Sequence, residues 1–263
     1  MPLWVCERRL NLMYGSEYSM ANVQIVSYSK QALNFPGEGE MSDLQELVAY
    51  CARVSNPGNQ NNAETSERLI RYLVKHRHWS PFEMVNICLE VNTTRDIARQ
   101  LLRHRSFSFQ EFSQRYANIS ELGGSGFNFQ LREARLQDTT NRQNSLDIDK
   151  TDIEQAYFAH QWEKKQKELI DWVDSTYQWA IENGMAKEQA RAILPEGLTM
   201  SRLYVNGTLR SWLHYIDVRT EAGTQKEHRE LAHQCAWQIA KLFPSIMNFD
   251  HVTEPVQTQE INK

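Results

Sequence analysis

The middle of this chain alternates between apolar and polar residues, and this pattern limits the folds open to it. From 85 to 91 every second residue is apolar, which is typical of a strand with one buried face. Thr93 or Thr94 then begins a helix whose apolar residues, including Ile97 and Leu101, recur at helical spacing. Because other segments repeat this mixture, the sequence predicts an α+β fold in which helix exceeds strand.

The same two periods predict the remaining elements. Strands are expected at 23–26 and 198–205, and helices at about 64–75, 152–183, 190–191, 208–218 and 225–242. Another helix is expected to start at Ser42, whose spacing to Gln45 forms a capping box. Gly184 is expected to end the long helix as its C-cap. The tryptophans of that helix, among them Trp172, are assigned to the core or to a subunit contact.

Three segments fall outside these periods. Residues 1–19 are expected to be an N-terminal extension, or alternatively an arm that packs on a partner subunit, with the functional start close to Met20. Residues 20–250 are expected to form a single catalytic domain, and 251–263 a C-terminal tail. The stretch 123–149 is rich in Gly, Asn and Gln without a period, and is predicted to be a long loop or insertion.

Composition narrows the cellular setting. Hydrophobic residues make up 41% of the chain, and no apolar run is long enough to cross a membrane, so no membrane association is expected. No cationic start followed by a hydrophobic core and a small-residue cleavage site is recognisable, so export is not expected. Its four cysteines lack the pairing of a metal motif or a disulfide scaffold, and we expect free thiols. These features predict a cytoplasmic protein without a bound metal.

The strongest chemical signal is a cluster of arginines between Arg95 and Arg115 in a chain whose formal net charge is −4. Guanidinium groups bind phosphate oxygens in a bidentate manner, so the cluster favours a site for a phosphate-bearing ligand. The alternative is a solvated basic helix end, which gains only about 0.3–1 kcal/mol from the helix dipole. That alternative does not account for Ser113 and Arg115, which continue the polar pattern past the turn.

Five blocks of sequence then resemble one family. Arg103-His104-Arg105, followed after seven residues by Ser113, resembles the RHRx7S signature of the flavin-dependent thymidylate synthases. Further similar blocks occur in family order: Cys51-Ala52-Arg53-Val54-Ser55, His76-Arg77-His78-Trp79-Ser80-Pro81-Phe82-Glu83, Arg191-Ala192-Ile193-Leu194-Pro195, and Arg210-Ser211-Trp212-Leu213-His214 leading to Arg219. The resemblance runs from about Ser42 to Leu242. It implies a helix-rich single domain with an antiparallel or mixed sheet.

Taken singly, most of these blocks have simpler interpretations. Ser80-Pro81-Phe82-Glu83 is a capping box with Pro at the first helical position. His78 is then a surface histidine, and Arg191 only complements a helix C-terminus. Arg210 and Arg219 flank an amphipathic helix, where arginines are common. The joint occurrence of the blocks is what favours function.

The resemblance implies two sets of binding residues. The residues implied for FAD are Ser80, Arg103, His104, Arg105, Glu111, Arg210, His214 and His78. The residues implied for dUMP are Gln100, Arg103, Glu111, Ser113, Gln114, Arg115, Arg191 and Arg219. Gln114 stands where many family members have a small residue, so only its backbone is expected to contribute.

The implied reaction converts dUMP to dTMP, with methylenetetrahydrofolate as carbon donor and NADPH as reductant through FAD. No cysteine lies within the arginine cluster, so thiolate addition to the pyrimidine is not expected. Arg219 is the implied catalytic residue, which stabilises negative charge as N3 of the pyrimidine ionises. The motif places no His or Lys base for Ser113, which is therefore assigned to binding.

The implied assembly is a homotetramer whose active sites are shared between subunits, with no nucleic-acid or membrane partner. Two alternatives stay open at this point. One is a nucleic-acid-binding module that uses the basic face of 95–115, and its affinity would fall steeply with salt. The other is a relative that binds nucleotide without turnover.

Overall fold

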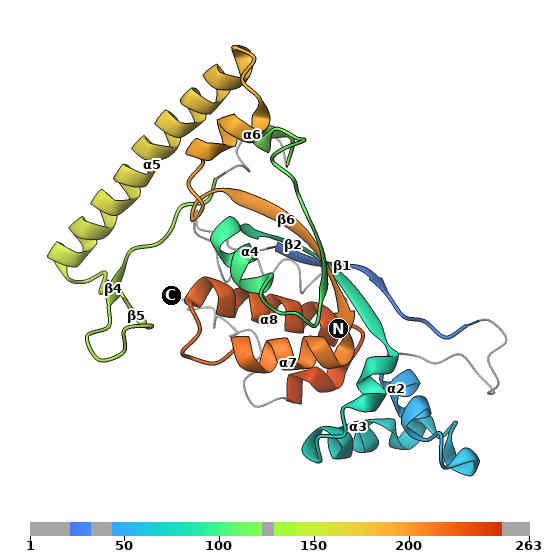
Figure 1. Cartoon of the computed structure of the whole chain (residues 1–263). Coiled ribbons are helices and arrows are strands. Elements are labelled where there is room, and N and C mark those ends of the chain that lie inside the picture. Colours follow the sequence, from blue (N-terminus) through green and yellow to red (C-terminus); the bar gives the residue numbers. More distant parts are fainter. Residues whose placement is uncertain (1–21, 33–43, 123–128, 249–263) are drawn as a thin grey trace, which may run out of the picture.

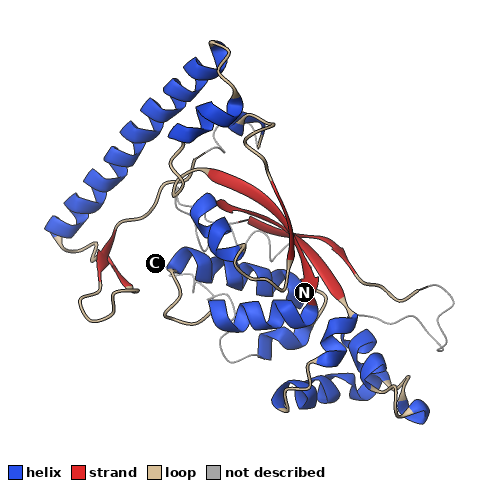
Figure 2. Cartoon of the chain, viewed as in Figure 1, coloured by secondary structure: helices blue, strands red, loops and turns tan. Residues whose placement is uncertain are grey.

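The fold is built around a four-stranded antiparallel sheet (Figure 2). The computed structural model describes residues 22–32, 44–122 and 129–248. The strand order is β1-β2-β6-β3. The strands are β1 (Asn22–Tyr28), β2 (Asn86–Thr94), β6 (Met200–Thr208) and β3 (Ser108–Glu111). The antiparallel sheet agrees with the expected fold class.

Strand β2 lies inside the sheet between β1 and β6. Its apolar side chains, such as Leu89, pack into the main core. Its other face is also largely covered, because Gln24 donates a hydrogen bond to Glu90 and Arg202 donates one to Asn92. The alternation therefore predicted the strand correctly, but the expected half-exposed face was wrong.

Two helices cover one face of the sheet, α7 (Leu209–Arg219) and α8 (Lys226–Ala240) (Figure 1). Trp212 and Tyr215 of α7 are fully buried there. Burial of one such side chain contributes about 1.5–3 kcal/mol or more relative to exposure, so this layer anchors α7 firmly. Helices α2 (Leu44–Ala52) and α3 (Ser66–Lys75) pack together at one end of the sheet.

The remaining helices lie around the other end. They are α4 (Arg95–Leu101), α5 (Ile153–Glu182) and α6 (Lys187–Ala190). Helix α5 stands apart from the sheet in Figure 1, and a short hairpin of β4 (Arg135–Gln137) and β5 (Ser145–Asp147) lies near its start. Short 3-10 segments connect these elements at Pro57–Asn59, Ala63–Thr65, Ser80–Met84, Ile119–Glu121, Arg191–Ile193 and Pro244–Asn248.

Helix α5 carries large aromatic side chains that are not in the core of the chain. Trp172 and Trp179 are 62% and 59% exposed, and Trp162 is 40% exposed. On the opposite side, Tyr177 is buried in a small separate cluster. The core assignment of these tryptophans was therefore wrong within one chain, and a subunit contact is the interpretation that stays.

Helix ends were predicted with mixed success. Gly184 follows α5 with a φ of 77°, in the left-handed region expected of a C-cap glycine. The capping box at 80–83 was wrong, because this segment is a 3-10 turn without a side-chain cap. Glu83 instead forms an ion pair with Arg210, far away in the sequence.

Several other predictions concern residues at or beyond the limits of the described ranges. The capping box at Ser42, the extension 1–19, the start at Met20 and the tail 251–263 lie outside them. Of the segment 123–149, the described part contains the β4–β5 hairpin, which the absence of a period did not predict. The strand expected at 198–205 lies at Met200–Thr208.

Candidate functional site

The centre of the site is a hydrogen bond between the arginine cluster and the end of α7. Nε of Arg219 donates to Nε2 of His104 at 2.9 Å. His104 lies in the turn after α4, and its ring makes edge contacts with Tyr215 and Phe107 at centroid distances of 5.0 and 6.4 Å. Burial, together with the charge of Arg219, lowers the pKa of His104 to about 4. The imidazole is therefore neutral near pH 7 and accepts the proton of Arg219.

Behind His104 lies a second histidine that the sequence did not single out. His228 of α8 is fully buried, with its ring centroid 6.3 Å from that of His104. Burial and the neighbouring charge of Arg219 lower its pKa to about 3. Its Nδ1 lies 3.1 Å from Oε1 of Gln100, which assigns Nδ1 as the donor. A histidine on the apolar face of a predicted helix was the available signal.

His228 therefore links Gln100 to the neighbourhood of His104 and Arg219. Its Nε2 donates to Oε1 of Gln225 at 2.7 Å. Arg103 and Arg105 flank His104 in the same turn, and both side chains are exposed. The structure thus brings together Gln100, the RHR segment and Arg219.

Glu111 is held beside the start of α4 rather than beside its end. It accepts a hydrogen bond from Oγ of Ser201 at 2.8 Å, and Nη1 of Arg95 lies 3.5 Å from its carboxylate. Burial lowers the pKa of Arg95, Glu111 opposes this change, and the charges of Arg99 and Arg191 add to it. Arg191 therefore lies in the neighbourhood of Arg95.

Arg115 and Arg191 meet at Glu188 of α6. Nε of Arg115 lies 3.6 Å from the carboxylate of Glu188, and Nε of Arg191 donates to its backbone carbonyl at 3.4 Å. Ser113 accepts a hydrogen bond from the backbone N–H of Arg115. The side chain of Gln114 is only 4% exposed, and its Nε2 has no hydrogen-bond partner among the described residues.

The dUMP set therefore forms two groups within one chain. One group, with Arg219, lies past the C-terminal end of α4, and the other, with Arg191, lies near its N-terminal end. No contact joins Arg191 to Arg219 among the described residues. The convergence of these arginines on one pocket therefore stays a prediction, and the contact that the structure shows is the one between Arg219 and the RHR turn.

Of the residues implied for FAD, Arg210 and His214 lie in the first half of α7 with Ser80 and His78 nearby, whereas Arg103, His104, Arg105 and Glu111 lie elsewhere, in the turn after α4 and beside its start. Arg210, in its first turn, forms an ion pair with Glu83, just after Ser80. One turn later the ring of His214 lies edge-on to Trp79, with centroids 4.8 Å apart. Burial and Arg210 lower the pKa of His214, which Asp217 opposes. His78 precedes Trp79, and its ring packs near His76 at 6.1 Å.

A cavity of about 470 Å³ opens beside this cluster. Trp79 and His214 line it together with three basic residues, Arg71, Lys75 and Arg77, and one acidic residue, Asp217. Aromatic surface next to cationic groups suits an aromatic ligand that carries phosphate. The donor set thus fits a flavin nucleotide.

Arg77 has a φ of 57°, the one non-glycine residue with positive φ in the described part of the chain. It follows the C-cap of α3, and the N–H of His78 reaches back to the carbonyl of Leu73 at 2.8 Å. A left-handed arginine costs about 1 kcal/mol more than a glycine in this place. The turn nevertheless places the guanidinium of Arg77 at the cavity.

The basic cluster does not form one uncompensated face. Arg95 pairs with Glu111, Arg99 with Glu196, and Arg115 with Glu188. A nucleic-acid module needs cations directed at phosphate along a shared surface. The acidic partners therefore disfavour the nucleic-acid alternative.

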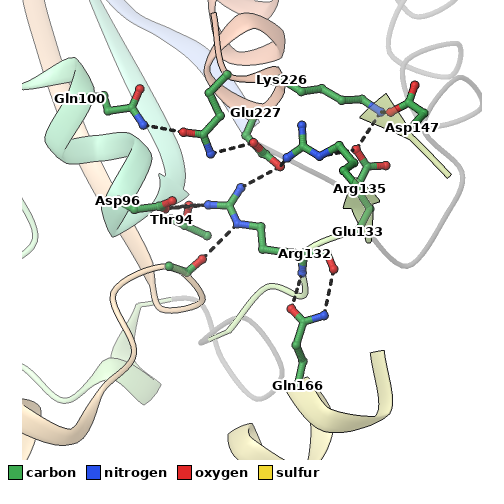
Figure 3. Close-up of polar contacts among 12 residues, drawn as sticks. Thr94, Asp96, Gln100, Arg132, Glu133, Arg135, Asp147, Gln166, Lys226 and Glu227 are labelled. Atoms are coloured by element: carbon green, nitrogen blue, oxygen red, sulfur yellow. Dashed lines mark hydrogen bonds and ion pairs between the residues drawn. The ribbon is translucent and has the colours of Figure 1, made fainter. Parts of the chain in front are cut away.

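A polar network at the other side of Gln100 was missed altogether (Figure 3). Arg132 and Arg135, from the segment predicted to be a loop, both form ion pairs with Glu227. Gln225 donates to the same carboxylate at 2.9 Å. No local pattern predicts contacts across some ninety residues of sequence.

The three described cysteines are partly or fully buried. Cys235 is fully buried in the main core, and burial raises its pKa strongly. Burial also raises the pKa of Cys51 and Cys88. Thiolates are thus disfavoured at all three positions.

Within the described ranges, no helix is long and apolar enough to traverse a bilayer.

Comparisons with known proteins agree on one family. Residues 39–245, more than half of the chain, match the model of the thymidylate synthase complementing protein family. A probable flavin-dependent thymidylate synthase of Paramecium bursaria Chlorella virus 1 is 48% identical over 206 residues, which cover 78% of this chain and 90% of the relative. The flavin-dependent thymidylate synthase of Synechocystis is 43% identical over 229 residues, covering 86% and 97%.

A solved structure has a similar fold. The UMP/dUMP methylase PolB from Streptomyces cacaoi, crystallised with 5-Br dUMP, aligns with a TM-score of 0.67 at 26% identity. The alignment covers 89% of this chain and 97% of PolB.

Proposed function

The chain belongs to the flavin-dependent thymidylate synthase family, and from that premise we propose how its residues divide the work. The reaction is the methylation of dUMP to dTMP, with methylenetetrahydrofolate as carbon donor and NADPH as reductant through FAD. The observation that carries the assignment of roles is the 2.9 Å hydrogen bond from Arg219 to a neutral His104. This hydrogen bond holds a permanent positive charge beside the RHR turn.

FAD is assigned to the cluster at the start of α7. Ser80, Arg210 and His214, with His78 nearby, would hold it beside the 470 Å³ cavity, and the RHR turn and Glu111 would complete the site. When bound, FAD supplies the hydride chemistry that these side chains lack. The cationic wall of the cavity offsets phosphate charge.

The dUMP molecule is assigned to Gln100, Arg103 and Arg219 at one end of α4. The guanidinium of Arg219 stabilises negative charge on the pyrimidine as N3 ionises, because it is preorganised by His104. A neutral His104 adds no competing positive charge and holds the guanidinium in one orientation. Buried cysteines are not needed for this activation.

The second dUMP group is assigned to a neighbouring subunit. Glu111, Ser113, Gln114, Arg115 and Arg191 lie near the other end of α4. A homotetramer with shared sites would bring Arg191 of one copy to Arg219 of another. The exposed tryptophans of α5 support such a contact, because large apolar side chains rarely stay exposed together.

Mixing of two inactive variants tests the shared site. Arg191→Ala and Arg219→Ala proteins are inactive alone, and subunit exchange between them restores about a quarter of the sites or fewer if each site takes one residue from each copy. Activity that stays absent after verified exchange contradicts sharing.

We also propose that the enzyme acts in the cytoplasm, and that residues 20–250 form its catalytic domain.

The decisive test of the function uses purified protein. A flavin spectrum, with NADPH oxidation that accelerates on adding dUMP and with dTMP formed when methylenetetrahydrofolate is present, supports it. A colourless protein that takes up no FAD on reconstitution contradicts it. Substitution of Arg142, an exposed arginine in the hairpin loop, serves as a neutral control.

A further inference from the structure

Arg132 ties the segment that begins at Gln130 to several other parts of the domain. Arg132 is 14% exposed, and its guanidinium lies 2.6 Å from the carboxylate of Asp96, at the start of α4. Its Nε donates to the carbonyl of Gly197 at 3.1 Å. Its own backbone N–H and carbonyl both bond to the side-chain amide of Gln166 on α5, at 2.8 and 2.9 Å. Arg132 thus joins α4, α5 and the segment before β6 (Figure 3).

Glu227 is the buried centre of this network. It lies in the first turn of α8, is 5% exposed, and takes ion pairs from both Arg132 and Arg135. Burial acts to raise the pKa of Glu227, but the hydrogen bond from Arg135 and the two positive charges lower it to about 2. Removal of either partner of a buried ion pair leaves an uncompensated charge, which is strongly unfavourable. The two ion pairs therefore hold the carboxylate of Glu227 in one position.

From Glu227 the network continues directly to Gln100. Nε2 of Gln225 donates to Glu227 at 2.9 Å, and Oε1 of Gln225 accepts from Nε2 of Gln100 at 2.7 Å. The other end of the Gln100 carboxamide accepts from His228. Both ends of this amide are thus specified, which fixes its orientation. An amide has two N–H donors and two lone pairs, so one of each stays available for a ligand.

We propose that Gln225 and Glu227 are positioning residues that hold the carboxamide of Gln100 in the orientation that binds the pyrimidine nucleotide. Arg132 and Arg135 anchor Glu227, so the 130–147 segment serves as the support of the nucleotide site. This inference rests on the proposed function, and it assigns a role to residues outside the five family-like blocks. Preorganised side chains bind more tightly because less rotational freedom is lost on binding.

Substitution of Gln225 by Met tests the central link. Met has a similar length but neither donates to Glu227 nor accepts strongly from Gln100. We expect KM for dUMP to rise about three- to tenfold, the effect of one lost hydrogen bond, with kcat and FAD content changed less than about twofold. Gln143→Met, at an exposed tip of the hairpin, is the matched control and should behave as wild type.

A double-mutant cycle separates positioning from general stability. In a Gln100→Ala background, Gln225→Met should have no further effect on KM, because its target is already gone. Equal increases in both backgrounds overturn the proposal, and so does an unchanged KM in the single variant. Glu227→Gln should raise KM in the same direction; if it does not fold, the Gln225 cycle still decides.

The outcome is distinguishable from failure of the function itself. Wild-type protein that lacks FAD and forms no dTMP contradicts the proposed function. Active wild-type protein, together with an unchanged KM for dUMP in the Gln225→Met variant, contradicts only the positioning role.

Discussion

Nε of Arg219 donates a hydrogen bond to Nε2 of His104 at 2.9 Å, and this contact links the last turn of α7 to the turn after α4. An arginine is always protonated in a protein, so Nε2 of His104 must be the acceptor. The tautomer of His104 is therefore set by Arg219. In turn, the imidazole fixes the plane of the guanidinium.

Replacement of Arg219 by Ala should nearly abolish dTMP formation while FAD stays bound. Loss of a preorganised charge at a developing anion typically costs about 100- to 1,000-fold in kcat. Single-turnover dTMP formation and the flavin spectrum measure the two effects. Arg142→Ala is the control, and normal turnover in Arg219→Ala would remove the catalytic assignment.

Thiol chemistry should be dispensable. A variant with Cys6→Ser, Cys51→Ser, Cys88→Ser and Cys235→Ala should retain methyl transfer, because burial disfavours the thiolates of the described cysteines. Stability should fall by about 1 kcal/mol, mainly at the fully buried Cys235. A folded, FAD-bound variant without turnover would refute the thiol-independent mechanism.

Stability should fall as the pH drops below about 6.5, the ordinary pKa of histidine. The pKa values of His104 and His228 are lowered to about 4 and about 3 in the fold, so the unfolded chain binds more protons between these values and 6.5. Each histidine then contributes a slope of at most about 1.4 kcal/mol per pH unit. The loss saturates below the folded pKa.

Urea unfolding between pH 5 and 8 measures this slope. His228→Gln, which keeps a donor for Gln100, should flatten it, whereas His160→Gln on the exposed face of α5 should leave it as in wild type. Equal slopes in all three proteins would show that His228 is not a buried neutral histidine.

Glu230 should respond to pH in the opposite direction. Burial raises its pKa to about 7, which Lys226 opposes and the charges of Glu133 and Glu227 support. Its neutral form favours the fold at low pH, and this stability is lost as pH rises from about 4.5 to about 7. Glu230→Gln should therefore stabilise the protein by about 1–2 kcal/mol more at pH 8 than at pH 5.

Thermal or urea midpoints of Glu230→Gln at the two pH values provide the measurement. Glu168→Gln, an exposed carboxylate on α5, is the control and should shift neither midpoint by more than a few tenths of a kcal/mol. A gain of Glu230→Gln that is independent of pH would contradict the buried ionisation.

Flavin retention should depend on the ion pair between Arg210 and Glu83. Arg210→Ala removes the cation and leaves Glu83 unpaired beside the cavity, so we expect FAD affinity to fall about tenfold or more. Equilibrium dialysis against FAD gives the affinity. Arg229→Ala on α8 serves as the control, and unchanged affinity in Arg210→Ala would move the flavin away from this end of α7.

Local periodicity was enough to predict most strands and helices. The long helix ends at Gly184 as expected, because a left-handed glycine is a local requirement. Local patterns failed where a distant partner decided the outcome. Ser80 to Glu83 has the letters of a capping box, yet Glu83 pairs with Arg210 instead.

Candidate site residues could be proposed from the sequence only where they lie within the family-like sequence blocks. The resemblance assigned His104 to FAD and Gln100 and Arg219 to dUMP; in the structure Arg219 bonds to His104, and His228 links Gln100 to the same neighbourhood. The supporting residues were not predicted, because Arg132 and Glu227 meet only after the chain has folded. Arginines in a segment that lacks a periodic pattern, such as 123–149, do not indicate which distant side chains they contact.

Gly207 of β6 lies against the ring of Phe107, and a β-carbon on it would come within 2.4 Å of that ring. Phe107 follows the RHR turn and packs on Trp212, with ring centroids 4.5 Å apart. The Phe107 ring therefore packs directly against the main chain of β6 at Gly207. An alanine at this position would force the Phe107 ring to move, so the packing of the residue that follows the RHR turn depends on the absence of a side chain at Gly207.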